Sequence, residues 1–244
     1  MTLKQIVKAA LALSTVGIIV LAGMRAGSLK VHADEENSAQ DLADIGLKIA
    51  PVPLNLQGKD PVLVGLGSYI VNAQADCNGC HTSSPMGTEY GPSNNPYLRP
   101  PLNRKPKVQA EYYLGGGQNF GSVGPGVSSG VYAAGPGNGP LIITRNLTPD
   151  YTGRPEGGHT LEQFLNIMRN GHDYDHLHPN CGGSVITNCY DAPVNGDLLQ
   201  VMPWPAFSNM TDYHLTAIWV YLSAIPCIAN TGSQYPNLVN QCTK

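Results

Sequence analysis

The stretch "ADCNGCHTS" (75–83) separates Cys77 and Cys80 by two residues and follows them directly with His81. This Cys-x-x-Cys-His pattern is typical of the site at which haem c is attached. Two thiols one helical turn apart can form thioethers with the two vinyl groups of one haem, and the adjoining histidine then ligates the iron. The pattern therefore predicts one covalently bound haem, with His81 as its proximal ligand.

The same residues are compatible with two other sites, half of a zinc site or a redox-active dithiol. A zinc site would need a second pair of ligands, and Cys181 and Cys189 are too far apart in sequence to resemble one. A thioredoxin-like dithiol would need strands and helices that alternate around it, and the sequence has no such alternation. Haem attachment is the interpretation that the rest of the chain favours.

A helix is predicted to lead into this motif. Asp60 is a suitable N-cap, Pro61 suits the first helical position, and apolar residues continue toward Cys77. Gly65 and Gly67 each weaken a helix by roughly 1 kcal/mol relative to alanine. We therefore expect these two glycines to allow close packing against another helix.

Two further helices carry clear end signals. The first is capped by Thr160 and ends at Gly171, and the second is capped by Thr211 or Asp212 and is stopped by Pro226. The whole chain contains 28 Gly and 20 Pro, and the segments between the predicted helices are rich in both. Runs of alternating apolar and polar residues are few. We therefore expect an all-α fold with long Gly/Pro-rich loops around the haem.

The first 33 residues are predicted to be a signal peptide, because basic residues precede the uncharged apolar run 9–23 and a cleavage site follows Ala33. The alternative is an uncleaved membrane anchor. Cleavage would leave 10 basic residues against 17 acidic ones, a balance that gives no electrostatic case for binding nucleic acid. The protein is thus expected to be periplasmic or secreted, or anchored in the membrane by its N-terminus.

Export to an oxidising compartment predicts that the remaining cysteines form disulfides. Four cysteines remain after haem attachment, and they allow three pairings. Proximity in sequence favours Cys181 with Cys189 and Cys227 with Cys242.

A low-spin haem needs a sixth ligand, and Met202 is the favoured candidate because prolines stiffen its loop "VMPWPAF" just before the last helix. Met210 is a weaker rival, Met168 is expected in the core, and Met86 is too close to Cys80 to reach the opposite face of the ring. Histidine ligation is the alternative. The loop with His172, His176 and His178 has metal-ligand residue types without regular spacing, so it is either a polar loop or a second metal site.

Several segments together resemble a class I-type cytochrome c domain, and in particular the cytochrome domains of periplasmic alcohol and aldehyde dehydrogenase cytochrome subunits. They are "GSYIVNAQADCNGCHT" (67–82), "TRNLTPD" (144–150), "TLEQFLNIMRNG" (160–171) and "MPWPAF" (202–207). The resemblance implies haem thioethers at Cys77 and Cys80 and axial ligands at His81 and Met202. It divides the chain into the signal segment 1–33, an N-terminal extension or linker 34–58, a cytochrome c domain 59–227 and a disulfide-tethered tail 228–244.

We therefore expect a monohaem c-type cytochrome that passes single electrons between protein redox partners and is not itself an enzyme. Arg145 either pairs with a haem propionate or faces solvent. One alternative is an electron-accepting subunit of a dehydrogenase complex. The other, a haem enzyme or ligand sensor, applies if Met202 does not ligate the iron.

Overall fold

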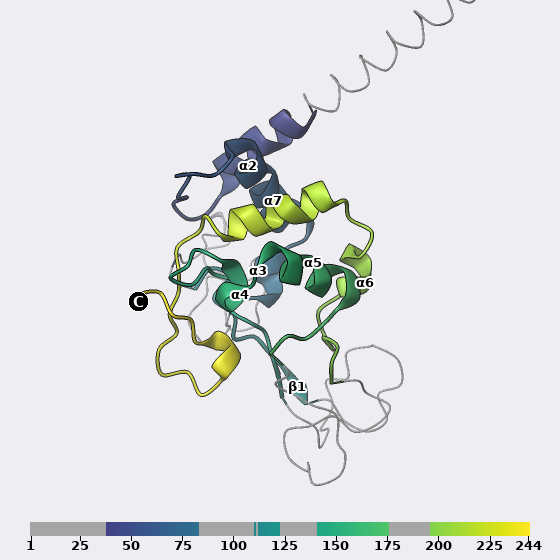
Figure 1. Cartoon of the computed structure of the whole chain (residues 1–244), viewed down its shortest axis with the longest axis vertical. Helices are drawn as coiled ribbons and strands as arrows, with labels where there is room; N and C mark the ends of the chain where they lie inside the picture. The colour runs from purple at the N-terminus through teal and green to yellow at the C-terminus, as the bar shows by residue number, and fades with distance from the viewer. Residues whose placement is uncertain (1–37, 83–109, 111, 123–140, 176–195) are drawn as a thin grey trace, which may run out of the picture. The chain divides into compact units, whose positions relative to one another are not determined.

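Residues 38–82, 110, 112–122, 141–175 and 196–244 are described by the computed structural model, in which helices predominate (Figure 1). The predicted signal segment and the Cys181–Cys189 pair lie outside these residues. From Pro61 on, the described helices are α2 (Pro61–Tyr69), the π-helix η1 (Ile70–Gln74), α3 (Cys77–Cys80), α4 (Pro155–Gly158), α5 (Leu161–Asn170), α6 (Trp204–Phe207), α7 (Asp212–Leu222) and the 3-10 helix η3 (Pro236–Leu238).

The chain divides into two units, Met1–Leu42 and Ala43–Lys244. Of the first unit the structure describes residues 38–42, which are helical, as are residues 43–49 of the second. The stretch expected to be an N-terminal extension, 34–58, thus contains helical residues. No helix in the described part of the chain is both long and apolar enough to cross a membrane.

Helix α2 begins as the sequence predicts and packs through its glycines. The side chain of Asp60 accepts a hydrogen bond from the N–H of Val62, and Pro61 opens the helix. A Cβ on Gly67 would lie 2.0 Å from the carbonyl oxygen of Ala217 in α7, and one on Gly65 would lie 2.3 Å from that of Ala43. The expected close packing at both glycines is therefore confirmed.

The other two predicted helices begin at the predicted caps, and α5 also ends as predicted, whereas α7 ends at Leu222, before the expected stop at Pro226. Thr160 caps α5 in a capping box with Gln163, and Gly171 ends that helix in the left-handed conformation with φ 68°. Thr211 caps α7, accepting a hydrogen bond from the N–H of His214. Both helices bury an apolar face, including Phe164 of α5.

The helix predicted to continue toward Cys77 is interrupted. At Ile70 it widens into η1, in which the N–H of Ala75 donates to the carbonyl of Ile70 at 2.8 Å, and it breaks at Asp76, whose φ is 46°. The Asn72 side chain donates to the carbonyl of Ser68 at 2.9 Å and accepts from the Tyr113 hydroxyl at 2.5 Å. These partly buried polar contacts accompany the wider turn, which places α3 after a sharp change of direction.

A small antiparallel sheet is the feature that the all-α expectation missed. Strand β1 (Asn119–Ser122) pairs with β2 (Leu141–Ile143), with Asn119 opposite Ile143. The strands have only four and three residues and carry no alternating pattern, so the sequence gives no strand signal there. The mostly helical character is confirmed, and β2 leads directly into Thr144 and Arg145.

The C-terminal tail is fastened to the domain by a disulfide between Cys227 and Cys242, as predicted. Asn240 strengthens this attachment, because its side-chain amide donates to the carbonyls of Thr148 at 2.9 Å and Pro149 at 3.0 Å.

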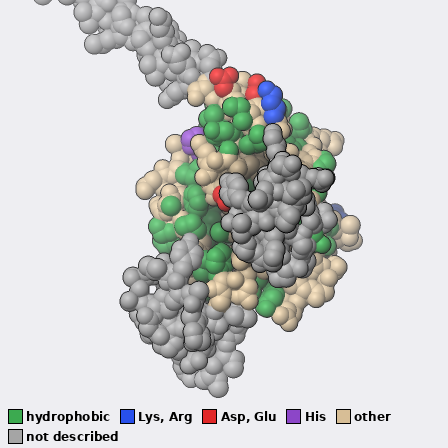
Figure 2. Space-filling view, turned by 180° about the vertical axis from the view of Figure 1, so that it is seen from behind, with side chains coloured by type: hydrophobic (Ala, Val, Ile, Leu, Met, Phe, Trp, Pro, Cys, Tyr) green, Lys and Arg blue, Asp and Glu red, His purple; other side chains and the backbone are tan. Residues whose placement is uncertain are grey.

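Hydrophobic side chains are spread over the face shown in Figure 2 and few basic ones are visible there, in keeping with a chain in which 13% of residues are charged.

Gly67→Ala is expected to lower the free energy of unfolding by about 1–3 kcal/mol, because its new methyl group would meet the backbone of Ala217. Urea unfolding measures this. Gly115→Ala is a matched control, since its Cβ would come no closer than 3.4 Å to the Ile228 side chain. Equal stability of the two variants would contradict the helix crossing.

Replacing both Cys227 and Cys242 by serine is expected to lower the free energy of unfolding by about 3 kcal/mol, the loop-entropy value for a closed loop of this length. Ser233→Ala, within the same loop, is the control. A double variant as stable as this control in urea unfolding would show that the disulfide does not constrain the unfolded chain.

Candidate functional site

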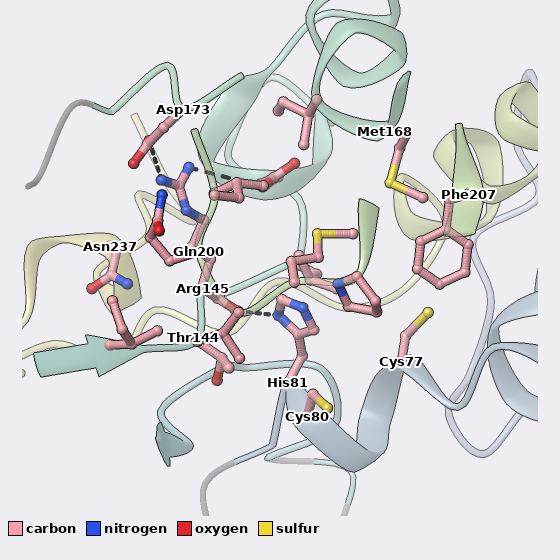
Figure 3. A pocket seen from close by; sticks show the side chains of 18 of the residues that line it. Cys77, Cys80, His81, Thr144, Arg145, Met168, Asp173, Gln200, Phe207 and Asn237 are labelled. Atoms are coloured by element: carbon pink, nitrogen blue, oxygen red, sulfur yellow. Dashed lines mark hydrogen bonds and ion pairs between the residues drawn. The ribbon is translucent and has the colours of Figure 1, made fainter. Parts of the chain in front are cut away.

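The predicted haem residues all line one largely apolar cavity. Cys77 and Cys80 line it from α3, His81 from directly after α3, and Arg145 from the segment after β2 (Figure 3). Met202 lines it from the loop before α6. Its empty volume is about 1250 Å³, counted out to its open mouth. Its lining is mostly apolar with a few polar side chains, which is the usual character of a cofactor site.

Helix α3 presents the three motif residues to this cavity. Its single turn is closed by the His81 N–H, which donates to the carbonyl of Cys77 at 2.9 Å. Figure 3 shows both cysteines and the histidine leaving the same short helix, with Cys77 on the side of Phe207 and Met168 in this view. Both thiols are free, so two attachment points and one ring nitrogen are available at one place.

The orientation of His81 follows from its hydrogen bond. Its Nδ1 lies 2.8 Å from the carbonyl oxygen of Arg145, which can only accept, so Nδ1 carries the proton and Nε2 keeps a free lone pair. Burial lowers the pKa of His81 to about 4, helped by the charge of Arg145 and opposed by this hydrogen bond. A neutral imidazole with its Nε2 free is the form that ligates a metal.

The two thiols are protonated at neutral pH. Burial raises the pKa of Cys77 to about 12, with Asp76 and Cys80 adding to the effect, and burial and Asp76 also raise that of Cys80. A reactive dithiol needs a lowered thiol pKa, so this environment disfavours that alternative. In the described ranges no three His, Cys, Asp or Glu side chains are placed to hold a metal ion, so a zinc site would need ligands from elsewhere in the chain.

Asn78, between the two cysteines, anchors the motif to the rest of the fold. It is 5% exposed, and its Oδ1 accepts hydrogen bonds from the N–H of Leu114 at 3.1 Å and from the Thr82 hydroxyl. Gly116 adds a backbone bond, because its N–H donates to the carbonyl of His81 at 2.8 Å. The segment 112–117 therefore supports the motif from one side.

Among the candidate sixth ligands, Met202 and Met168 line the cavity. Met168 is also a core residue of α5, at 4% exposure. Met210 is absent from the described residues that line the cavity, and Met86 lies outside the described part of the chain. Met202, the favoured candidate, thus lines the cavity together with Met168, which was expected in the core and is buried there as well.

The Met202 loop is held by a tight contact with the end of α5. A Cβ on Gly171 would lie 2.3 Å from the ring of Trp204, so only glycine fits there. The N–H of Trp204 donates to the carbonyl of Met202 at 2.8 Å, and the N–H of Leu199 donates to that of Gly171 at 2.8 Å. These bonds fix the loop on the wall of the cavity.

The side chain of Arg145 neither faces solvent nor stands alone. It is 8% exposed and forms ion pairs with three carboxylates: a hydrogen-bonded one with Asp173, one of 2.6 Å with Asp175 and one of 4.0 Å with Glu156. Arg145, Asp173 and Glu156 line the same cavity as His81, so a carboxylate of a bound cofactor could reach Arg145 only in competition with these acids.

Sequence reasoning missed three contributions to the site. It chose Arg145 for its side chain, whereas the backbone carbonyl of that residue orients His81. It gave no role to Asn78 or Glu156, because neither belongs to a spacing pattern.

Of the three histidines in the predicted polar loop, the structure describes His172, whose ring makes an edge-to-face contact with Tyr174 at 4.5 Å between ring centres. His176 and His178 lie outside the described residues, so a metal site there stays a prediction.

No protein-family model, curated protein or solved structure matches the chain. The resemblance to dehydrogenase-associated cytochrome domains therefore stays a prediction carried by the motifs. The arrangement of the cavity is the independent observation on which a function can be argued.

Asn78→Ala is expected to lower the free energy of unfolding by about 1–3 kcal/mol, because the buried N–H of Leu114 would lose its acceptor. Asn170→Ala, which removes only an exposed bond to Asn166, is the control and should change stability by less than about 0.5 kcal/mol. Urea unfolding compares the two. Equal losses would contradict the anchoring role of Asn78.

Proposed function

We propose that the protein is a monohaem c-type cytochrome that carries single electrons between periplasmic protein partners. The observation that carries this proposal is the meeting, in one cavity, of two free thiols, a neutral histidine with its Nε2 free and a methionine thioether. When bound, haem c supplies an iron that alternates between the ferric and ferrous states by one electron. We propose in addition that residues 59–227 form a helical domain of the cytochrome c type around this haem.

Each residue then has a distinct role. Cys77 and Cys80 would hold the cofactor covalently, and His81 and Met202 would supply a nitrogen and a sulfur ligand to its iron. The carbonyl of Arg145 keeps the His81 ring in one tautomer and one orientation. Because the chain would supply both of these ligands, little would have to reorganise when an electron is gained or lost.

The apolar walls serve the same function by excluding water. Phe164, Ile167 and Leu222 are buried side chains that line the cavity from α5 and α7. Burial of the cofactor and methionine ligation both favour a higher reduction potential than an exposed bis-histidine haem would have. The redox partners are proposed to be a dehydrogenase and a downstream acceptor, as the resemblance implies.

Met202→Ala is expected to abolish the weak near-red absorption band of methionine-ligated ferric haem and to lower the midpoint potential. Absorption spectra of the protein co-expressed with haem-attachment machinery test this. Met168→Leu, on the same cavity, and Met210→Leu, outside its described lining, are the controls and should keep the band.

The outcomes separate the candidate functions. Haem that stays with the chain after denaturation supports attachment at Cys77 and Cys80. A band that survives in Met202→Ala but is lost in a control moves the ligand to that methionine. A wild-type protein without the band, whose ferrous form binds carbon monoxide rapidly, would replace electron transfer by the sensor or enzyme interpretation.

A further inference from the structure

Three carboxylates crowd around one buried guanidinium beside the candidate haem cavity. Arg145 faces Asp173, Asp175 and Glu156, and Glu156 is itself 6% exposed. If all four groups were ionised, the cluster would hold an excess of two negative charges in a poorly hydrated place. An ionised carboxylate is costly to bury without full compensation, so one of these acids is a candidate to bind a proton.

Glu156 is the least compensated of the three. Asp173 accepts hydrogen bonds from Arg145 and from the N–H of Asp175, and Asp175 lies 2.6 Å from Arg145 with its side chain 36% exposed. Glu156 is 4.0 Å from the guanidinium, and no described group donates a hydrogen bond to its carboxylate. Burial raises the pKa of Glu156, against the lowering effects of Arg145 and His159.

The backbone holds the Glu156 side chain inward at an energetic cost. Its φ is 53°, a left-handed conformation that usually costs a non-glycine residue about 1–3 kcal/mol. The conformation is supported by Nδ1 of His159, which donates to the carbonyl of Glu156 at 2.6 Å, and by Gly157, with φ 72°. Strain of this kind persists where surrounding contacts fix it, and it is frequent at functional positions.

Glu156 also connects two cavities of different character. Glu156 and Arg145 line both the apolar cavity of His81 and a neighbouring polar cavity with about 950 Å³ of empty volume. The polar cavity is also lined by Asn240, whose buried Oδ1 has no hydrogen-bond partner, and Nη1 of Arg145 makes no hydrogen bond of good geometry. A polar cavity with such groups is a suitable place for internal water, which can pass protons to and from solvent.

We propose that Glu156 binds a proton when the cofactor gains an electron and releases it when the electron leaves. This inference rests on the proposed function. The electron comes from the protein redox partner and the proton comes from solvent through the polar cavity, so the total charge of the site stays the same in both states. Among the described residues, the other titratable groups that act on Glu156 are Arg145, Asp173, Asp175 and His159.

The expected pH dependence has a definite sign. An added electron makes the site more negative and therefore raises the proton affinity of Glu156. At pH values where the oxidised protein has released the proton and the reduced protein has kept it, the midpoint potential falls as pH rises, by at most about 59 mV for each tenfold fall in proton concentration. Outside that window Glu156 has the same charge in both states and adds no slope.

The test is a spectroelectrochemical titration of the haem-loaded full chain at a series of pH values. The wild type should show the falling potential, Glu156→Gln should lose that slope, and Glu162→Gln should keep it. Glu162 is a matched control because it is an exposed glutamate in the first turn of α5. A wild-type potential that does not vary with pH, or an unchanged slope in Glu156→Gln, would overturn the inference.

A second measurement covers the case in which Glu156→Gln does not fold. The infrared difference spectrum between reduced and oxidised wild type should contain the C=O band of a protonated carboxyl, and ¹³C in glutamate side-chain carboxyls should shift it. A band that does not shift assigns the proton to a propionate or aspartate and contradicts the proposal. A reversible one-electron wave with a flat potential overturns only the role of Glu156, whereas absence of the wave or of bound haem removes the proposed function itself.

Discussion

The hydrogen bond from Nδ1 of His81 to the carbonyl of Arg145 joins the two halves of the site. It connects the turn that carries both thiols to a segment 64 residues later in the chain. That segment is itself fixed, because the side-chain amide of Asn146 donates to the carbonyls of Ile228 and Leu238, and the hydroxyl of Thr148 accepts from the N–H of Ile228. The "NLTPD" motif therefore works mainly as a clamp that holds the Arg145 backbone against the histidine.

Arg145 acts in two directions at once. Its carbonyl sets the tautomer of His81, while its guanidinium gathers Asp173, Asp175 and Glu156 on the polar side of the same cavity. A shift of this one residue would change both the orientation of the His81 ring and the compensation of the three carboxylates. The site therefore has an apolar part, in which the thiols and the imidazole are neutral, and an acidic part, whose carboxylates lie next to the polar cavity.

The sequence was sufficient wherever a local rule decides the structure. The caps at Asp60, Thr160 and Thr211, and the left-handed end at Gly171, depend on side chains and backbone freedom within a few residues. The Cys-x-x-Cys-His spacing is equally local, so the positions of both thiols and of the histidine followed from it. Packing at the helix glycines was predicted because glycine has few other reasons to lie inside a helix.

The sequence was insufficient where distant residues decide. The widened turn η1 accompanies two hydrogen bonds of Asn72, which donates to Ser68 and accepts from Tyr113, and only Ser68 is close to it in sequence. The strands β1 and β2 are too short to leave a pattern, and a backbone carbonyl such as that of Arg145 has no sequence signature at all. The role of Glu156 could not be predicted from the sequence either, because the fold determines its burial and its neighbours.

The acid cluster also bears on why this site would keep a buried arginine. A buried ion pair seldom stabilises a fold more than apolar side chains of the same volume would, because desolvation offsets most of the attraction. Three acids around one guanidinium are less favourable still, and the left-handed backbone at Glu156 adds to the cost. Stability is thus a weak reason for the cluster. Control of charge beside the proposed haem is a stronger one, because a group that is poorly compensated in one charge state responds most to a change of one charge nearby.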